Sequence, residues 1–548
     1  MNKEKEYIII DNLLNAAIFF IIVCYFLIPA LVISQQRADE VLRIGDLASR
    51  VQCLNPFEEG TYEEEYVKQI IFGKSLSFYN LQTDLIDIGI INSYTANHDS
   101  TQWQVSIKEG IVFHDGTALN AEDIVFSITL FKEYIDRIQP PYNVQIDWIN
   151  TIEALGPIDL LITLARKISD LPYLLNGIQI ISQSYYQGIN IEETLYNLEE
   201  MTPFGYGPFS VSRIAPGNRI SLVRHSDYYK GPPAIPQIDI LLFQQSSQLT
   251  SGLMLEELDV IPVHQIRYKK DIARERSSGP RFVLVNQKVP YRLMTFIDYN
   301  LSNEILVSEN IRSSLAMLYE RYDYVQSSFQ FDVRQEARGP VPEDSWAYFD
   351  NYPRAIRNPE RAVQLLEDEG WRDADNDRIR EKSNVHLTLT TLYPANEEYY
   401  EYLVRKLKSN LGEIGIEIRE TALNKDDLRE RIRNKNYQLA ISNSRYYPYD
   451  LIKTFMNALD IYGDEIHRNI PGENADQALR QFIRTTLAPN QRQMLETFRQ
   501  LQYLMEQAVT STYFAGQHQR IIAFNESRIG NFLQDNKISD VENWILKR

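Results

Sequence analysis

The sequence predicts an α/β protein of more than one domain, preceded by an N-terminal transmembrane helix. Three observations lead to this prediction. The chain has 548 residues, which is too long for one hydrophobic core and enough for two or three domains. Short strand patterns alternate with helical patterns along most of its length. An uncharged run, AAIFFIIVCYFLIPALVI, fills residues 16–33, and this is close to the length at which an apolar helix crosses a bilayer.

The N-terminal run leaves two interpretations open. It is longer than the apolar core of a typical signal peptide, and no small-residue cleavage pattern follows Pro29. These features favour an uncleaved anchor, and a cleaved signal peptide is the alternative. Both interpretations place the residues after about 37 on the extracytoplasmic side of the cytoplasmic membrane.

Composition and charge narrow the class of protein. The chain is 44% hydrophobic and 24% charged, which is ordinary for a globular protein. Its formal net charge of -18 argues against nucleic acid as a partner, because phosphates require a basic surface. Cys24 lies in the apolar run, so Cys53 is the one remaining thiol. A disulfide framework and a cysteine-based metal site are therefore excluded.

The first half of the chain carries strand patterns and one well-marked helix start. Asn120 follows a turn and is expected to cap a helix, with Asp123 as the reciprocal partner of a capping box. Glu63, Glu64 and Glu65 are interpreted as a solvated helix face. The expected strands are 43–47, 103–107, 219–223 and 238–243.

A second αβ region is expected from about Arg292. Pro359 suits the first turn of a helix and Gly370 suits its exit. The expected helices of this region are 310–325, 359–370 and 396–411, and the expected strands are 385–392 and 414–418.

Patterns that would indicate catalysis are incomplete. Gly73-Lys74-Ser75 ends like a phosphate-binding loop, but Lys68 stands where its first glycine is needed. No Gly-x-Ser-x-Gly elbow occurs, and none of the seven histidines pairs with another at helical zinc spacing. We therefore expect neither an enzyme nor a bound cofactor or metal.

One acidic run has the spacing of a calcium loop. Asp373, Asp375 and Asp377 fall at its first, third and fifth positions. Arg378 replaces the glycine of the sixth position and Asn384 replaces the glutamate of the twelfth. We interpret the run as a polar hairpin, and weak calcium binding stays open as the alternative.

Five blocks, in the same order along the chain, resemble the family 5 extracellular solute-binding proteins. The first, IKEGIVFHDGTALNAEDIVFSI, covers residues 107–128. The second opens with GYGPFSVSRIAPGNRISLVRHSDYYKGPP at residue 205. The remaining blocks are residues 310–325, residues 339–371 and residues 411–450. Together the five blocks extend over nearly the whole predicted exported part.

The resemblance implies a two-lobed fold of the periplasmic-binding-protein type, of type II with an extra subdomain. The two α/β lobes would be joined by a hinge and close around a ligand. We expect residues 1–37 to form a cytoplasmic tip and the anchor or signal sequence, and 38–285 to form lobe I with the inserted subdomain. Residues 286–504 would form lobe II, and 505–548 would return to lobe I.

The resemblance also implies a function. It predicts a substrate-binding receptor of an ABC-type importer, monomeric, which captures peptides or similar small solutes and delivers them to permease subunits in the membrane. Two alternatives stay open. One is a membrane-tethered sensor or assembly protein that uses the same fold without an importer. The other is a carrier of nickel or of another metal chelate.

The ligand-binding residues are inferred from the fifth block. Peptide-binding members carry an aspartate two residues before a proline, where it pairs with the ammonium group of the peptide; here Tyr446 takes that place. Arg445 would favour a negative ligand group, and the tyrosines offer stacking faces and hydroxyl groups. The candidate ligand-binding residues are Tyr446, Tyr447, Tyr449, Asp450, Arg445, Tyr393, Asn300 and Trp346.

Overall fold

The computed structural model describes most of residues 40–547. The predicted anchor at 16–33 lies outside the described residues. Within the described part, no helix combines the length and the apolar character needed to span a membrane. The gaps in the description are 58–59, 81–84, 139–145, 147, 169–170, 190–201, 264–281, 320–333, 338, 343–344, 346, 349–356, 396–397, 448–453, 455–460, 463–464, 467–494, 497, 501, 504–510 and 533–537.

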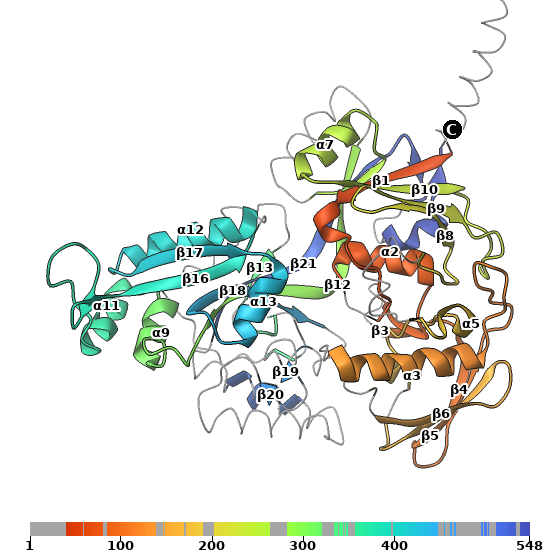
Figure 1. Ribbon diagram of the computed structural model, residues 1–548, viewed down its shortest axis with the longest axis horizontal. Coiled ribbons are helices and arrows are strands. Elements are labelled where there is room, and N and C mark those ends of the chain that lie inside the picture. The colour runs from red at the N-terminus through yellow and green to blue at the C-terminus, as the bar shows by residue number, and fades with distance from the viewer. Residues whose placement is uncertain are drawn as a thin grey trace, which may run out of the picture.

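The described residues form two lobes around separate hydrophobic cores (Figure 1). The first core, which defines lobe I, extends from Leu42 to Trp544, so residues near the C-terminus pack in the same lobe as β1 (Val41–Leu47). The second core, which defines lobe II, extends from Ile297 to Ile441. The chain is thus a mixed α/β protein with two lobes, as its sequence predicts.

One sheet runs through both lobes. Its strand order is β17-β16-β18-β12-β21-β11-β1-β10-β9-β8, and β13 pairs with β21 beside this path. The strands are β1 (Val41–Leu47), β8 (Phe209–Ala215), β9 (Arg219–Arg224), β10 (Gln237–Phe243), β11 (Val260–Pro262), β12 (Phe282–Tyr299), β13 (Arg334–Glu336), β16 (Thr388–Pro394), β17 (Glu417–Leu423), β18 (Leu439–Tyr446) and β21 (Ser511–Asn525).

Two long antiparallel strands, β12 and β21, connect the lobes (Figure 1). At the lobe I end, β21 pairs with β11. At the lobe II end, β12 pairs with β18, from Arg292 opposite Tyr446 to Tyr299 opposite Leu439. The pairing of β12 with β21 is interrupted between Lys288 and Leu293. This interruption includes Pro290, which has no backbone N–H to donate to a ladder.

Lobe I contains the other strands and helices of the first half of the chain. A second sheet, with the order β4-β5-β7-β6, contacts α3 through β6. The elements are η1 (Ala48–Arg50), α2 (Tyr62–Phe72), β2 (Ser77–Asn80), β3 (Leu85–Ile88), β4 (Ile91–Ala96), β5 (Gln102–Ile107), α3 (Ala121–Ile138), β6 (Ile149–Ala154), β7 (Asp159–Leu164), α4 (Leu171–Leu174), α5 (Gln183–Tyr186) and α7 (Ser246–Met254), with β22 (Ile529–Gly530), η3 (Ile538–Asn543) and β23 (Ile545–Leu546) near the C-terminus.

Lobe II packs helices against β16 and β17. Both α12 and α13 contact β16, and α9 packs against α11. The elements are α9 (Glu309–Ala316), α11 (Pro359–Asp368), β14 (Glu381–Lys382), β15 (Val385–His386), α12 (Glu398–Gly412), α13 (Lys425–Arg433), β19 (Ile461–Tyr462) and β20 (Glu465–Ile466).

Local sequence signals explain several element boundaries. The Asn120 side chain accepts a hydrogen bond from the Glu122 N–H at 2.8 Å, and Asp123 accepts one from the Asn120 N–H at 2.9 Å, at the start of α3. Pro359 is the first residue of α11, and Gly370 follows the helix with a φ of 87°. These predicted helix ends are confirmed, because caps and turns depend on neighbouring residues.

Two predicted strands differ from the structure. The expected strand 385–392 is divided at Leu387 between β15 and β16. The expected strand 414–418 begins later, as β17, because Gly415 has a φ of 84° and Ile416 donates back to the Leu411 carbonyl in a turn. The predicted boundary between residues 285 and 286 falls inside β12, and the division into domains stays a prediction.

Candidate functional site

The end of β18 contacts lobe I through Arg445. Its guanidinium Nη2 donates a hydrogen bond to the Gly60 carbonyl oxygen at 2.8 Å, between residues 385 positions apart. Gly60 directly precedes Thr61, the N-cap of α2, and its own N–H donates to Glu65 Oε1 at 2.7 Å. A side chain on Gly60 would meet Glu64 Oε2 at 2.5 Å. Glycine at position 60 avoids this clash, and its carbonyl oxygen is the atom that Arg445 contacts.

The first turn of α2 makes a second contact with the strands that join the lobes. The Tyr62 hydroxyl donates to Gln287 Oε1 on β12 at 2.5 Å. Thr61 caps the helix by accepting from the Glu64 N–H, and the Glu64 carboxylate accepts from the Thr61 N–H. The reciprocal cap fixes the direction of the helix, so Tyr62 is oriented toward β12.

Acidic side chains are buried beside this helix. Asp46 and Glu63 are both 0% exposed, and the Tyr66 hydroxyl donates to Asp46 Oδ2 at 3.0 Å. Burial raises the pKa of Tyr66 well above its ordinary value, and the negative charges of Asp46 and Glu63 raise it further. Glu63 and Glu64 do not form a solvated face, so that interpretation of the sequence was wrong. The Glu64 carboxylate accepts from the backbone N–H groups of Gln52, Cys53 and Thr61, which the local pattern does not reveal.

Tyr446 is buried at the end of β18. It is 1% exposed, and its hydroxyl donates to Ser345 Oγ at 2.5 Å. Arg292, its register partner on β12, lies with the guanidinium carbon 5.9 Å from the centroid of the tyrosine ring. Because neighbouring residues of a strand point to opposite faces, Tyr446 points away from the face on which Arg445 reaches lobe I.

The next residue, Tyr447, is also 1% exposed. Its backbone N–H donates to Thr454 Oγ1 at 2.8 Å, and the Thr454 hydroxyl donates to the Tyr447 carbonyl at 3.3 Å. Ser345 and Thr454, which contact the two tyrosines, come from segments on either side of β18 in the sequence. The candidates Tyr449, Asp450 and Trp346 lie outside the described residues.

Two other candidates are at the opposite end of β18. Asn300 is 4% exposed, and its amide donates to the Lys435 and Tyr437 carbonyls at 2.8 and 2.7 Å. Tyr393 is half-buried near the end of β16, and burial raises its pKa, as do the nearby carboxylates Glu420 and Glu401. The length of β18 separates both from Tyr446 by roughly 20 Å. Arg445, Tyr446 and Tyr447 are thus consecutive at the end of β18, with Arg445 and Tyr446 on opposite faces, and Asn300 and Tyr393 lie elsewhere.

The contacts Arg445–Gly60 and Tyr62–Gln287 together form the junction between the lobes. The sequence did not predict the lobe I residues of this junction. Gly60, Tyr62 and Gln287 all contact residues that are distant in sequence. The one available signal was the pairing of Thr61 with Glu64, which is the pattern of a capping box. It predicts where α2 begins but gives no information about which lobe faces it.

Comparisons with known proteins agree with this architecture. Residues 88–461 match the bacterial extracellular solute-binding proteins, family 5 Middle. The oligopeptide-binding protein AppA of Bacillus subtilis is 24% identical over 61% of this chain, and the match spans 61% of its own length. The probable D,D-dipeptide-binding periplasmic protein DdpA of Escherichia coli is 22% identical over 76% of each chain.

Solved structures show the same fold. AppA of Bacillus subtilis in complex with a nonapeptide superposes with a TM-score of 0.75 at 17% identity, covering 93% of this chain and 99% of that one. NikZ of Campylobacter jejuni in complex with Ni(L-His) superposes with a TM-score of 0.76 at 16% identity, covering 92% and 99%. The fold is therefore of the periplasmic-binding-protein type. With the family match covering more than half of its residues, this chain belongs to the family 5 bacterial extracellular solute-binding proteins.

Proposed function

We propose that this protein is the extracytoplasmic substrate-binding receptor of an ABC-type importer, and that it binds peptides or similar small solutes between its lobes. It acts by binding and release, without catalysis. Support comes from the family match and from relatives named for oligopeptide and dipeptide binding. A further relative is named as a probable ABC transporter periplasmic-binding protein.

The observation that carries this proposal is the junction between the lobes. The strands β12 and β21 are the continuous connection, and the Arg445–Gly60 hydrogen bond joins surfaces of opposite lobes. Bending of two strands changes the distance between the lobes, whereas a polar contact between their surfaces exists only when they are close. This combination is what hinge closure around a ligand requires, and a closed form is what a permease would recognise.

Ligand recognition in this proposal differs from that of amine-binding relatives. Residue 446 is a tyrosine with a buried ring, so it brings no carboxylate to balance the charge of a buried ammonium group, which is costly to leave unpaired. We place recognition on Arg445, Tyr446 and Tyr447, on Tyr449 and Asp450, which follow them in the sequence, and on Trp346. The guanidinium favours a carboxylate or another acceptor on the solute.

The same proposal includes the location and state of the protein. Residues 16–33 would anchor a monomer to the cytoplasmic membrane, with residues after 37 on the extracytoplasmic side. Intact-mass measurement of the protein from native membranes tests the anchor. A mature N-terminus between Ile33 and Glu40 would show that the segment is cleaved.

Calorimetric titration of the full chain in detergent tests the function. The ligands are a pool of defined peptides and, separately, Ni(L-His)₂. We expect saturable heat with members of the peptide pool and none with the nickel complex. Binding of the nickel complex alone would identify a metal-chelate carrier. No binding of either ligand, by protein that is folded and free of co-purified solute, would contradict the receptor function.

A further inference from the structure

Two histidine side chains of lobe I converge on a single backbone carbonyl. His114 Nε2 lies 3.2 Å from the Gly207 carbonyl oxygen, and His225 Nδ1 lies 3.1 Å from the same oxygen. Their rings meet edge to face, with centroids 5.1 Å apart. Because a carbonyl oxygen only accepts hydrogen bonds, both rings donate to it and both of its lone pairs are used.

The hydrogen bonds fix the protonation state of His114. Its Nδ1 accepts from the Gly205 N–H at 3.4 Å, while its Nε2 donates to Gly207. The ring is therefore neutral, because a charged imidazole donates from both nitrogens. A proton added to Nδ1 would place two N–H groups face to face. It would also place a positive charge beside His225, which is only 6% exposed.

Three further groups act on this pair of histidines. Asp115, exposed beside His114, and Asp227, exposed two residues after His225, are carboxylates that favour the charged form of each ring. The Tyr228 ring has its centroid 6.4 Å from that of His225. Burial outweighs the carboxylates. It lowers the pKa of His114 to about 4, with a smaller contribution from His225, and it also lowers the pKa of His225.

The carbonyl that the histidines share belongs to a turn packed on the end of α2. The Gly207 N–H donates to the Ile71 carbonyl at 2.9 Å. A Cβ on Gly207 would lie 2.2 Å from the Ile70 carbonyl oxygen, and one on Gly205 would lie 2.5 Å from the Phe72 Cα. The turn is thus in direct backbone contact with α2, so a shift of the turn displaces the helix.

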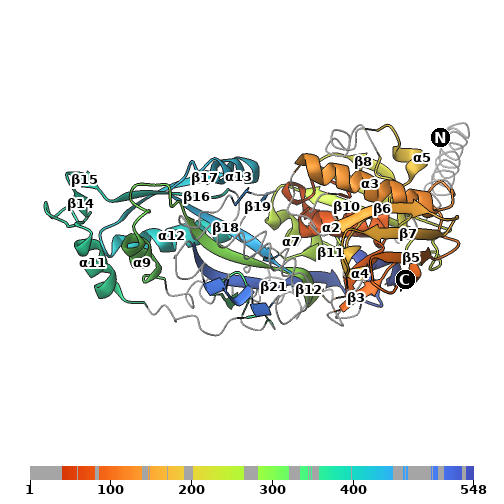
Figure 2. The same ribbon diagram turned by 90° about the horizontal axis from the view of Figure 1, so that it is seen from below.

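The other end of α2 forms the junction between the lobes. The helix is continuous over 11 residues, a length of about 16 Å, and lies beside the strands that lead to lobe II (Figure 2). Its first residue, Tyr62, contacts Gln287 on β12, and Gly60, just before its N-cap, accepts from Arg445 on β18. A continuous series of contacts therefore runs from the two histidines, through α2, to both contacts of the junction.

We propose that His114 and His225 form a pH-sensitive switch, which displaces α2 in acid and so weakens the binding of solute between the lobes. The inference rests on the proposed receptor function and adds its regulation. With both rings neutral, the turn holds α2 where Gln287 and Arg445 contact its first turn. A proton on His114 breaks the hydrogen bond from Gly205, and its charge moves the turn. The helix follows, and the junction between the lobes opens.

The direction of the effect follows from where the proton is bound more tightly. In the closed form the pKa of His114 is about 4, whereas its ordinary value is 6.5. Closure therefore expels a proton at a pH between these values. The affinity is complete above about pH 6.5 and falls by up to about tenfold per pH unit below it. The decrease ends near pH 4, where both forms are protonated.

Calorimetric titration of the full chain in detergent, with a peptide from the pool that binds at pH 7.0, tests the switch. The peptide contains no aspartate, glutamate or histidine, so its own charge is nearly constant between pH 7.0 and pH 5.0. We expect an affinity at least about tenfold lower at pH 5.0. Titrations in two buffers of different ionisation enthalpy should show about one proton released for each peptide bound at pH 5.0.

A substitution that keeps the donor and removes the charge isolates the switch. The amide of His114→Gln takes the place of Nε2 and still donates to Gly207, so this variant should bind normally at pH 7.0. Its affinity should change less than about threefold by pH 5.0, and its proton release should nearly disappear. The proton release of the natural chain is a test that needs no variant.

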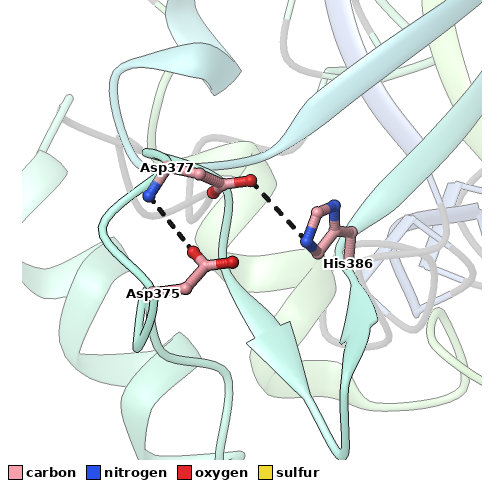
Figure 3. Close-up of side chains that lie close together, drawn as sticks. All are labelled: Asp375, Asp377 and His386. Atoms are coloured by element: carbon pink, nitrogen blue, oxygen red, sulfur yellow. Dashed lines mark hydrogen bonds and ion pairs between the residues drawn. The ribbon is translucent and has the colours of Figure 1, made fainter.

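His386 provides the matched control. It is an exposed histidine of the β14–β15 hairpin in lobe II, with Nε2 3.6 Å from Asp377 Oδ2 and with Asp375 nearby (Figure 3). His386→Gln makes the same change of side chain far from α2, so it should keep the full decrease in affinity. Near-UV circular dichroism should be the same at both pH values, which separates the switch from unfolding.

The possible failures of the switch and of the receptor function differ. Equal affinities at the two pH values, or the same decrease in His114→Gln as in the natural chain, would overturn the switch and leave the receptor function standing. Unfolding of the natural chain by pH 5.0, or loss of the decrease in His386→Gln, would also overturn the switch. Absence of solute binding at pH 7.0 would contradict the receptor function and the switch with it.

Discussion

The guanidinium of Arg445 on β18 of lobe II donates a hydrogen bond to the Gly60 carbonyl oxygen, 2.8 Å away in lobe I, just before the N-cap of α2. The contact lies one residue before Tyr446, whose ring is buried. Because the bond joins the two lobes, it belongs to a state in which they are close together. It therefore links the conformation of the hinge to one named side chain.

Replacing Arg445 with methionine keeps most of the volume of the side chain and removes its charge and donors. A hydrogen bond from a charged group contributes about 1.5–3 kcal/mol. If that energy favours closure, the affinity for solute falls about 10- to 100-fold, as measured by titration calorimetry. Arg429→Met on the exposed face of α13 is the matched control. Equal affinity in all three proteins would show that Arg445 has no part in closure or binding.

Substitution of Tyr446 tests whether its ring is packed inside the protein or lines the cleft between the lobes. Because its ring is 1% exposed, Tyr446→Ala should lower the free energy of unfolding by about 3–5 kcal/mol. Tyr446→Phe removes only the hydroxyl that contacts Ser345 and should cost about 0.5–1.5 kcal/mol. Denaturant titration measures both values. A loss below about 1 kcal/mol in the alanine variant would mean that the ring lines an open cleft.

His114 makes stability depend on pH. Burial, with a smaller contribution from the nearby His225, lowers its pKa from 6.5 to about 4, although a hydrogen bond to the Gly207 carbonyl opposes the shift. Its Nδ1 accepts from the Gly205 N–H at 3.4 Å, so protonation of Nδ1 would place two hydrogens face to face. The unfolded chain therefore binds a proton at a pH where the folded chain does not.

The sign of the effect follows from that difference. The stability is complete above pH 6.5 and decreases as the pH falls toward 4, by up to about 3 kcal/mol from this residue. Denaturant titrations between pH 7 and pH 4 measure it. His114→Gln should show a smaller decrease than the natural chain, whereas His98→Gln, at an exposed position, should keep the full decrease. Parallel curves for all three proteins would contradict the assignment to His114.

Gly207 is a position where packing excludes a side chain. A Cβ there would lie 2.2 Å from the Ile70 carbonyl oxygen and 2.6 Å from the Ile71 carbonyl oxygen on α2. Gly207→Ala should therefore lower the free energy of unfolding by about 1–3 kcal/mol, the usual cost of overpacking. Gly156→Ala, with no atom within 4 Å of its added carbon, should change it little. Thermal or denaturant unfolding compares the two, and an equal effect would refute the packing argument.

The sequence predicts features of the fold that depend on neighbouring residues. The caps at Asn120 and Pro359 and the turn at Gly370 are of this kind, and the structure confirms them. It could not predict that β12 is one strand of 18 residues, because its partners change along its length and Pro290 interrupts its pattern. A strand that links two lobes is defined by pairings with β18 and β21, which come from distant parts of the chain.

In the candidate site, too, some residues could be predicted from the sequence and others could not. The tyrosine segment was found because its residue types are unusual beside a family pattern. Its counterpart in lobe I was not found, because Gly60 contributes only a carbonyl and Tyr62 resembles any first-turn helical residue. The acidic run that begins at Asp373 shows the opposite error. The identity of Arg378 argued against a sharp turn that its backbone nevertheless makes.

The central claim is that the two lobes enclose a small solute. Native mass spectrometry of the full chain, purified from its host membranes without unfolding, tests it most directly. The account predicts a population heavier than the chain by the mass of a peptide or similar solute, which is released on denaturation and can be sequenced or identified. A single species at the mass of the chain, unchanged after incubation with the peptide pool, would contradict it.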